Sequence, residues 1–478
     1  MAQIDSNLIN TIVGRVLSEL ERQQIAPKAG LAATVAAGRS GVFEDVDPAV
    51  AATVEAQKIW ARSPIELRTR VIEALRKAMH DHADEFARMA RDETGMGRLE
   101  DKILKHHNAA NSTPGIEDLV SHSWSGDKGL TVEDYAPYGV VAAITPSTHP
   151  IPVLLNSIII IIAPGNGAVF NVHPAAKKVS AYAMQIFNQA IEKAGGPANL
   201  VTLIREPTME SANRLFRHPA IALIAATGGP ALVQAAFASG KKVIAAGPGN
   251  PPVLVDATAH LDEAARHIID GAAFDNNILC IAEKEVFVLE PVFNDFTAAM
   301  DRAGAVRLSA EQIESLTSQV FSRNNSGHWI PSRDFVGKNA SVLARAVGIS
   351  LSDDVRLLYG ETGSDHPFVQ EEQMMPFMPV VCAQDLDEAI EMAITAEHGY
   401  RHTAMIHSND LKTITRFSKA IDTSIVVVNG PSFAGNGPPA GEGYFSHTIS
   451  SPTGEGVCTP KDFARVRRIC TFRSLRMT

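Results

Sequence analysis

Cysteine is scarce in this chain. Its 478 residues include only four cysteines, Cys280, Cys382, Cys458 and Cys470, and no two of them form a CxxC pair. A disulfide scaffold or a structural zinc site needs clustered cysteines, and the sixteen histidines do not cluster at metal-ligand spacing either. We therefore expect no bound metal and a protein that works in a reducing compartment.

Long apolar runs are also missing. The longest one, residues 151–163, is interrupted by Asn156 and Ser157 and stopped by Pro164. It falls short of the ~18 residues that a membrane-spanning helix requires. The first twenty residues mix polar and apolar side chains instead of forming the apolar block of a secretory leader. The sequence therefore predicts a soluble cytoplasmic protein without a membrane partner.

Positive charge is not in excess. Lys and Arg total 43 against 53 Asp and Glu, which gives a formal net charge of −10. An acidic chain without dense Lys/Arg runs makes a poor general nucleic-acid binder, so we expect no nucleic-acid partner. The 45% hydrophobic and 20% charged content is that of an ordinary globular protein, and the length predicts more than one domain.

Several common catalytic motifs are absent. The chain contains no GxGxxG, GxxxxGK[ST], HExxH or GxSxG sequence. These absences exclude the common dinucleotide-binding loop, the P-loop, the HExxH zinc proteases and the hydrolases with a nucleophile elbow. A dinucleotide would have to bind to this chain in another way.

Strand-like and helix-like patterns alternate along most of the chain. Residues 49–107 are helical in pattern, and residues 139–254 alternate between the two. In the latter segment we expect strands at 140–145, 168–172, 200–204, 220–226 and 242–246, and helices at 151–163, from Pro174 to Gly195, at 211–217 and at 230–239. A second alternating region covers 261–428. This alternation predicts a doubly wound α/β fold with a parallel sheet.

The first residues follow a different pattern. Apolar side chains recur every four positions from Ile4 to Leu20, which predicts an amphipathic helix. Residues 21–41 are rich in Ala, Gly and Gln without sustained periodicity, which predicts a flexible linker. The apolar stripe either docks into a groove of a partner or packs on the rest of the chain, and the pattern alone favours neither.

Cys280 has a distinctive setting. It follows an Asn-Asn pair within residues 274–284 (FDNNILCIAEK) and precedes a strand-like stretch at 284–289. A nucleophilic cysteine must be accessible and partly ionised, and nearby backbone N–H groups can stabilise its thiolate and a developing oxyanion. A lone cysteine among Ile and Leu is also a common core residue, so both interpretations stay open on pattern alone. Cys382, next to the apolar run 377–381, is expected in the core.

Short motifs occur along the chain in a fixed order. They are PYGVV at 137–141, TPSTHP at 145–150, APGN at 163–166, HP at 173–174, TGG at 227–229, GPGNPP at 247–252, the Cys280 segment, EQMMPFMP at 372–379, HG at 398–399 and RHTA at 401–404. With this series, the chain from Val46 to Phe472 resembles the aldehyde dehydrogenase superfamily. It most resembles the CoA-acylating branch found in bacterial microcompartments, the protein-shelled bodies of the bacterial cytoplasm.

The resemblance implies a domain organisation. The expected parts are an amphipathic targeting helix (1–20), a linker (21–45), a variant Rossmann-type NAD-binding domain (46–120 and 139–251), an α/β catalytic domain (252–429) and a β oligomerisation arm (121–138 and 430–478). Arms of this kind imply a homodimer or homotetramer. The targeting helix implies shell or cargo proteins as partners and a location inside a microcompartment.

The resemblance also implies a reaction. Cys280 would attack an aldehyde to give a thiohemiacetal and then, after hydride transfer to NAD, a thioester. In hydrolytic members a glutamate activates water against this thioester, and Ala245 occupies that position here. Coenzyme A would therefore accept the acyl group, and the implied substrate is a short aliphatic aldehyde, propionaldehyde or acetaldehyde. The alternatives are a hydrolytic enzyme that releases the free acid and a non-catalytic microcompartment scaffold.

Further site residues follow from the matched motifs. His149 stands where the branch usually has an asparagine that contributes to the oxyanion hole. The residues implied in NAD binding are Thr145, Pro146, His173, Thr227, Gly228, Gly229, Gly247 and Glu372. Among them, the threonine-glycine-glycine segment would open a helix near the pyrophosphate, and Glu372 would hold the nicotinamide ribose.

Overall fold

A computed structural model describes residues 40–324 and 327–476. The chain divides into residues 1–39 and 40–478. The predicted helix at 1–20 and most of the predicted linker lie outside the described residues. The last part of that linker contains a short strand, β1 (Val42–Phe43), which pairs with β6. Regular structure therefore begins before the boundary expected at Val46.

The first sheet has six parallel strands in the order β1-β6-β5-β4-β7-β8. Its other strands are β4 (Val140–Thr145), β5 (Gly167–Val172), β6 (Val201–Ile204), β7 (Ile221–Thr227) and β8 (Lys242–Ala246). All residues of β4 and β5 are buried, as expected for parallel strands that are covered on both faces. The predicted parallel α/β architecture is confirmed.

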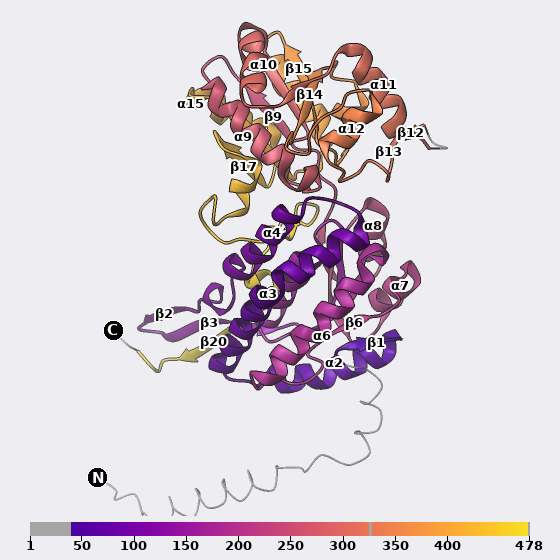
Figure 1. The fold of residues 1–478 in the computed structure, drawn as a ribbon. Coiled ribbons are helices and arrows are strands. Elements are labelled where there is room, and N and C mark those ends of the chain that lie inside the picture. The colour runs from indigo at the N-terminus through magenta and orange to yellow at the C-terminus, as the bar shows by residue number, and fades with distance from the viewer. Residues whose placement is uncertain (1–39, 325–326, 477–478) are drawn as a thin grey trace, which may run out of the picture. The chain divides into compact units, whose positions relative to one another are not determined.

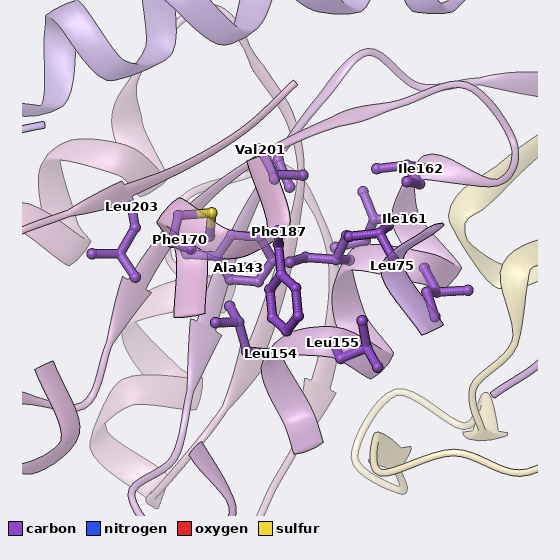
Figure 2. Packing of buried hydrophobic residues seen from close by; sticks show 14 of the residues in the cluster. Leu75, Ala143, Leu154, Leu155, Ile161, Ile162, Phe170, Phe187, Val201 and Leu203 are labelled. Atoms are coloured by element: carbon purple, nitrogen blue, oxygen red, sulfur yellow. The ribbon is translucent and has the colours of Figure 1, made fainter. Parts of the chain in front are cut away.

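Helices cover both faces of this sheet (Figure 1). They are α2 (Val46–Trp60), α3 (Ile65–Thr94), α4 (Leu99–Ser112), α5 (Pro150–Ile162), α6 (Lys177–Lys193), α7 (Met209–Arg217) and α8 (Pro230–Phe237). Every residue of α5 is buried, so the isoleucine-rich run forms the predicted core helix. Figure 2 shows Leu154 and Leu155 of α5 near Phe187 of α6, within one apolar cluster.

The second sheet has seven parallel strands in the order β11-β14-β15-β10-β9-β16-β17. The strands are β9 (Pro252–Val255), β10 (Glu285–Leu289), β11 (Val306–Arg307), β14 (Leu358–Glu361), β15 (Phe377–Ala383), β16 (Thr403–His407) and β17 (Ile425–Val428). Its helices are α9 (Leu261–Ala273), α10 (Phe293–Arg302), α11 (Ala310–Val320), α12 (Ala340–Ala346), α13 (Pro367–Gln370), α14 (Leu386–Glu397) and α15 (Leu411–Ile421). Two short antiparallel pairs complete this part, β12 (Phe321–Arg323) with β13 (Trp329–Pro331), and β18 (Ile449–Ser450) with β19 (Gly456–Val457).

A third, antiparallel sheet joins distant parts of the chain. It consists of β2 (His122–Gly126), β3 (Gly129–Pro137) and β20 (Ala464–Phe472). Figure 1 shows β20, the last strand, beside β3. Trp124, Val466, Ile469 and Phe472 expose more than half of their surface on these strands. The sheet occupies the segments predicted as an oligomerisation arm, and that role stays a prediction.

None of the helices within 40–324 and 327–476 combines the length and the apolar character needed to cross a membrane.

Candidate active site

The order in which the chain adds strands to the first sheet reverses at β4. From β4 the chain builds β5 and β6 on one side and then crosses back to add β7 and β8 on the other. Ligands of open α/β sheets bind outside the carboxyl ends of the strands at such a point. Thr145 is the last residue of β4 and Pro146 follows it, and Gly228 and Gly229 follow β7. The topology therefore brings these predicted cofactor residues together at the carboxyl ends of the strands.

Two features at these strand ends fit a phosphate-bearing dinucleotide. The hydroxyl of Thr145 is buried and has no hydrogen-bond partner among the described residues. Gly229 caps the N-terminus of α8, and a Cβ at this position would meet nothing within 4 Å. An open helix N-terminus beside an unpartnered hydroxyl suits a pyrophosphate. The N–H of Gly228 already donates to the carbonyl of Ala246 (3.1 Å).

Two other predicted cofactor residues, His173 and Gly247, also make contacts within the fold. His173 follows β5, and its Nδ1 accepts a hydrogen bond from the Ala175 N–H (3.1 Å). Burial, followed by the charge of Arg333, lowers the pKa of His173. Gly247 follows β8, where an added Cβ would lie 3.2 Å from the ring of Pro452. Each position has a packing reason as well as the implied binding role.

Cys280 follows a turn of unusual backbone conformation. Asp275, Asn276 and Asn277 have φ angles of 48°, 57° and 67°. Residues other than glycine rarely adopt this left-handed conformation, and three in a row are costly unless the surroundings hold them in place. Aspartate and asparagine tolerate it best, because their short side chains form local hydrogen bonds.

Side-chain hydrogen bonds hold this left-handed turn. Nδ2 of Asn276 donates to the carbonyl of Gly337 (2.9 Å). Nδ2 of Asn277 donates to the carbonyls of Ala272 and Glu283 (2.9 Å each). The Asn-Asn pair that precedes the cysteine in the sequence therefore shapes the turn, and both side chains are buried.

Asp275 anchors the beginning of the turn to α4. The residue is fully buried, with 0% exposure. One carboxylate oxygen accepts a hydrogen bond from the backbone N–H of Arg98 (2.7 Å), and the other contacts Nζ of Lys102 (3.2 Å) and of Lys105. Two lysines thus surround one buried carboxylate, which gives this contact a net positive charge.

Lys284 holds the end of the turn. Its Nζ donates to the carbonyl of Asn277 (2.9 Å), to Oδ1 of the same residue (2.6 Å) and to the carbonyl of Leu279 (3.1 Å). These three bonds use all of the ammonium protons and fix the backbone just before Cys280. Burial lowers the pKa of Lys284 to about 8, and the nearby Glu372 opposes this effect.

The Cys280 thiol is partly exposed but strongly desolvated. Burial, followed by the charge of Glu372, raises the pKa of this thiol to about 12. Lys284 and the backbone N–H groups of Cys280 and Ile281 act in the opposite direction. These groups would stabilise negative charge on sulfur or on an oxygen bound beside it.

Gly249 contacts both Glu372 and Cys280. Burial raises the pKa of Glu372 to about 7, whereas the charge of Lys284 and a hydrogen bond from the Gly249 backbone lower it. A Cβ on Gly249 would lie 2.6 Å from the carbonyl oxygen of Cys280. Position 249 therefore needs a glycine, and the segment after β8 reaches both the cysteine and the glutamate.

Glu372→Gln should make Cys280 more reactive toward iodoacetamide. Removing the negative charge lowers the pKa of the thiol, and only the thiolate reacts. At pH 9, where Glu372 is ionised, we expect the variant to be alkylated about three to ten times faster than the wild type. As the pH falls through 7, Glu372 takes up a proton and the two rates should converge.

Peptide mass spectrometry measures this alkylation at Cys280 separately from the other cysteines. Cys470, which is exposed on β20, serves as an internal control whose rate should be the same in both proteins. Equal rates at Cys280 at pH 9 would show that Glu372 does not act on the thiol.

His149 forms part of a buried polar cluster. It is the N-cap residue of α5, and its Nδ1 lies 2.6 Å from Nζ of Lys105. Its ring stacks on that of His447, with the ring centroids 5.9 Å apart. Burial, followed by the charge of Lys105, lowers the pKa of His149 well below its ordinary value. The imidazole is therefore neutral at physiological pH.

Sequence reasoning missed Lys105 and His447. The signal for Lys105 lay in α4, where Lys102, Lys105 and Ala109 recur at helical spacing and form the buried face, whereas Leu104 is 55% exposed. No signal marked His447, which reaches the cluster from the C-terminal segment.

The remaining cysteines differ in their surroundings. Cys382 packs against the core of the second sheet, as expected, and keeps part of its surface exposed. Cys458 is buried, with Sγ 3.1 Å from the Ser450 hydroxyl. Residues 40–324 and 327–476 contain no group of three His, Cys, Asp or Glu side chains placed to hold a metal.

Ala245 lies near the end of β8 and is fully buried. Its side chain belongs to an apolar cluster that also contains Ala226 and Val233, and its N–H donates to the Thr453 hydroxyl (3.0 Å). At this position the chain has no side chain that could activate water.

Comparison with known proteins gives a consistent result. The sequence model of the Aldehyde dehydrogenase family matches residues 21–316 and 358–443. Acetaldehyde dehydrogenase (acetylating) EutE of Salmonella typhimurium is 45% identical over 439 residues, which cover 91% of this chain and 93% of that protein.

Two solved structures are similar over most of their length. A propionaldehyde dehydrogenase from the fucose utilisation microcompartment of Clostridium phytofermentans has a TM-score of 0.89 and 44% identity, with 92% of this chain and 100% of that chain covered. The propionaldehyde dehydrogenase of Rhodopseudomonas palustris, solved with bound CoA and an acylated cysteine, has a TM-score of 0.89 and 40% identity at the same coverage.

Proposed function

Because the chain belongs to the aldehyde dehydrogenase family, we propose that it is a CoA-acylating enzyme that converts a short aliphatic aldehyde, CoA and NAD to acyl-CoA and NADH. Propionaldehyde or acetaldehyde is the proposed substrate, in line with the names of the similar proteins. The enzyme is an oxidoreductase that acts on aldehydes with CoA.

The setting of Cys280 carries this proposal. The cysteine is partly exposed, follows a left-handed turn held by buried hydrogen bonds, and lies among N–H groups and a lysine that favour negative charge. A merely structural cysteine needs none of these features. The similar protein with an acylated cysteine supports a covalent role for this residue.

Cys280 would act as the nucleophile. After the thiol has lost its proton to water, the Sγ thiolate would attack the carbonyl carbon of the aldehyde, and the negative charge would pass to the oxygen of the resulting thiohemiacetal. The N–H of Cys280 and an N–H of His149 are the proposed donors to this oxygen. A bound nicotinamide supplies the acceptor for the hydride that leaves the substrate carbon. The acyl group then stays on Sγ as a thioester.

Release of the acyl group distinguishes the two enzymatic alternatives. Hydrolysis needs a general base for water, and position 245 offers only a methyl group. A thiolate from CoA is a better nucleophile than neutral water and keeps the energy of the thioester. Ala245 therefore supports transfer to CoA.

One observation favours hydrolysis as a second candidate. The charge of Glu372 acts on Cys280, and its pKa of about 7 is suited to a general base near neutral pH. If Glu372 activates water, the enzyme releases the free acid without CoA. We favour its proposed role on the nicotinamide ribose, because Ala245 stands at the position of the glutamate that activates water in hydrolytic members.

The proposed NAD site lies at the carboxyl ends of β4 and β7 in the first sheet. Thr145 and Pro146 would line it, and Gly228 and Gly229 at the start of α8 would meet the pyrophosphate. His173 would contact the adenosine ribose. The remaining residues proposed for this site are Thr227, Gly247 and Glu372. We propose NAD as the preferred cofactor over NADP.

NADH formation with propionaldehyde and NAD, with and without CoA, tests the function. We expect turnover that requires CoA, with acyl-CoA detected by mass spectrometry in equal amounts to NADH. Replacing NAD with NADP should lower kcat/KM. The E372Q variant serves as the control for hydrolysis. Equal turnover without CoA in the wild type would show that water accepts the acyl group and that the acylating proposal is wrong. If E372Q then accumulated the acyl-enzyme, detected by intact-protein mass spectrometry, Glu372 would be the base that activates water.

The location and assembly of the enzyme are part of the proposal. The amphipathic pattern at residues 1–20 supports binding to shell or cargo proteins of a bacterial microcompartment, as the source of a similar enzyme suggests. The exposed apolar side chains on β2 and β20 support a homodimer or homotetramer built through the antiparallel sheet.

A further inference from the structure

His149 and Lys105 are in direct contact within the buried polar cluster that also contains His447. Nζ of Lys105 lies 2.6 Å from Nδ1 of His149, and both residues are at least nine-tenths buried. Burial lowers the pKa of Lys105 to about 8, so below that pH its Nζ is an ammonium group, which can only donate hydrogen bonds, and Nδ1 accepts. A neutral imidazole that accepts at Nδ1 carries its proton on Nε2.

The imidazole has good reason to be neutral. It faces positive or basic groups from every element packed against it: Lys105 and Lys102 from α4, His447 from the C-terminal segment and Lys284 after the turn. Burial and these charges oppose a second proton on the ring. Two acids lie in the cluster: Asp275 contacts the two α4 lysines, and the buried Asp101 accepts a hydrogen bond from the Asp275 N–H (2.8 Å).

Asp275 links this contact to the nucleophile. Its carboxylate contacts Lys105, and it is the first residue of the left-handed turn that leads to Cys280. The same lysine therefore touches the residue before α5 and the turn before the cysteine. This shared contact fixes the two segments relative to each other.

We propose that Lys105, held by Asp275, is a positioning residue that keeps His149 in the Nε2–H tautomer and so makes it a hydrogen-bond donor toward the substrate oxygen bound at Cys280. This inference rests on the proposed function. The usual asparagine needs no such partner, because its amide always carries N–H groups. A histidine at this position does, because the other tautomer would present a lone pair to the oxyanion.

A double-mutant cycle tests the proposal. Lys105→Met removes the donor, and we expect kcat/KM for CoA-dependent propionaldehyde oxidation to fall about 10- to 100-fold, as when one oxyanion donor is lost. Lys105→Gln keeps an N–H donor and should lose much less. In a His149→Asn background, Lys105→Met should cost less than about threefold, because asparagine has no tautomer to fix.

Nitrogen NMR of protein labelled at histidine provides a second readout. The signals missing from the H149N spectrum identify His149. We expect the Nε2–H pattern in the wild type and K105Q, and a mixture of tautomers in K105M. This readout does not depend on turnover, so it separates the role of Lys105 from a general loss of activity.

The outcomes are distinct. An Nδ1–H tautomer in the wild type, or an equal loss from Lys105→Met in the histidine and asparagine backgrounds, would overturn the proposal and leave Lys105 a structural residue. A wild-type enzyme without CoA-dependent turnover would instead contradict the proposed function, and the NMR spectra would still decide the tautomer.

Discussion

Cys280→Ala will lower acyl-CoA formation by about 10⁴-fold or more. Without the sulfur no thiohemiacetal or thioester forms, and the remaining groups can only bind the substrates. NADH formation and acyl-CoA formation should fall together, because both depend on the same covalent step. The measurement is turnover with saturating propionaldehyde, NAD and CoA, together with intact-protein mass spectrometry for an acylated enzyme.

Cys470→Ala is the matched control for this prediction. Cys470 is exposed on β20, so its loss should leave turnover within about twofold of the wild type. If Cys280→Ala kept its activity, another residue would be the nucleophile. If neither the wild type nor any variant oxidised an aldehyde, the chain would be the non-catalytic scaffold.

Asp275→Ala will destabilise the protein strongly. The change leaves Lys102 and Lys105 buried without their carboxylate and removes the acceptor for the Arg98 N–H. Breaking a buried ion pair from one side typically costs about 3–5 kcal/mol. Alanine also tolerates the left-handed backbone worse than aspartate. We expect a lower urea midpoint and loss of turnover beyond the loss of folded protein.

Two variants frame this experiment. Asp275→Asn keeps an oxygen acceptor and tolerates the left-handed backbone, so it should lose less stability than Asp275→Ala. Asp262→Ala removes an ion pair with Arg302 whose side chains are 65% and 58% exposed, and should change stability by less than about 1 kcal/mol. Should Asp275→Ala unfold at the same urea concentration as Asp262→Ala, the buried network would contribute nothing to the fold.

The sequence predicted the parallel sheets well. The strand expected at 140–145 is β4, and the buried helix expected at 151–163 is α5 with bounds shifted by one residue. Both are long apolar segments bounded by glycine or proline, and burial on all sides gives such segments a clear pattern. The alternation of these segments also fixed the fold class.

The sequence predicted helical structure over most of α4 but not its burial pattern, in which charged residues are buried and an apolar one is exposed. Lys102 and Lys105 are buried, whereas Leu104 is exposed. Hydrophobic periodicity assumes that charges face water, and this helix departs from that rule because Asp275 neutralises part of its buried charge. The partner is 170 positions away from Lys105, so no local pattern could reveal the pairing.

The candidate site could be predicted only in part. Motif resemblance identified Cys280, Glu372 and His149. It did not identify the residues that act on them, because contacts such as Lys105 with His149 join segments 44 positions apart through side chains alone.

The pairing of β3 with β20 has a consequence for the synthesis of the chain. Glu133 and Arg468, which form an ion pair across these strands, are 335 positions apart. At a translation rate of about 5–20 residues per second, β3 emerges from the ribosome roughly 20–70 s before its partner strand exists. During that time one edge of the β2–β3 hairpin has open N–H and C=O groups that can pair with a neighbouring nascent chain. A polysome, which carries many such hairpins at once, is therefore where this protein is most exposed to misassembly.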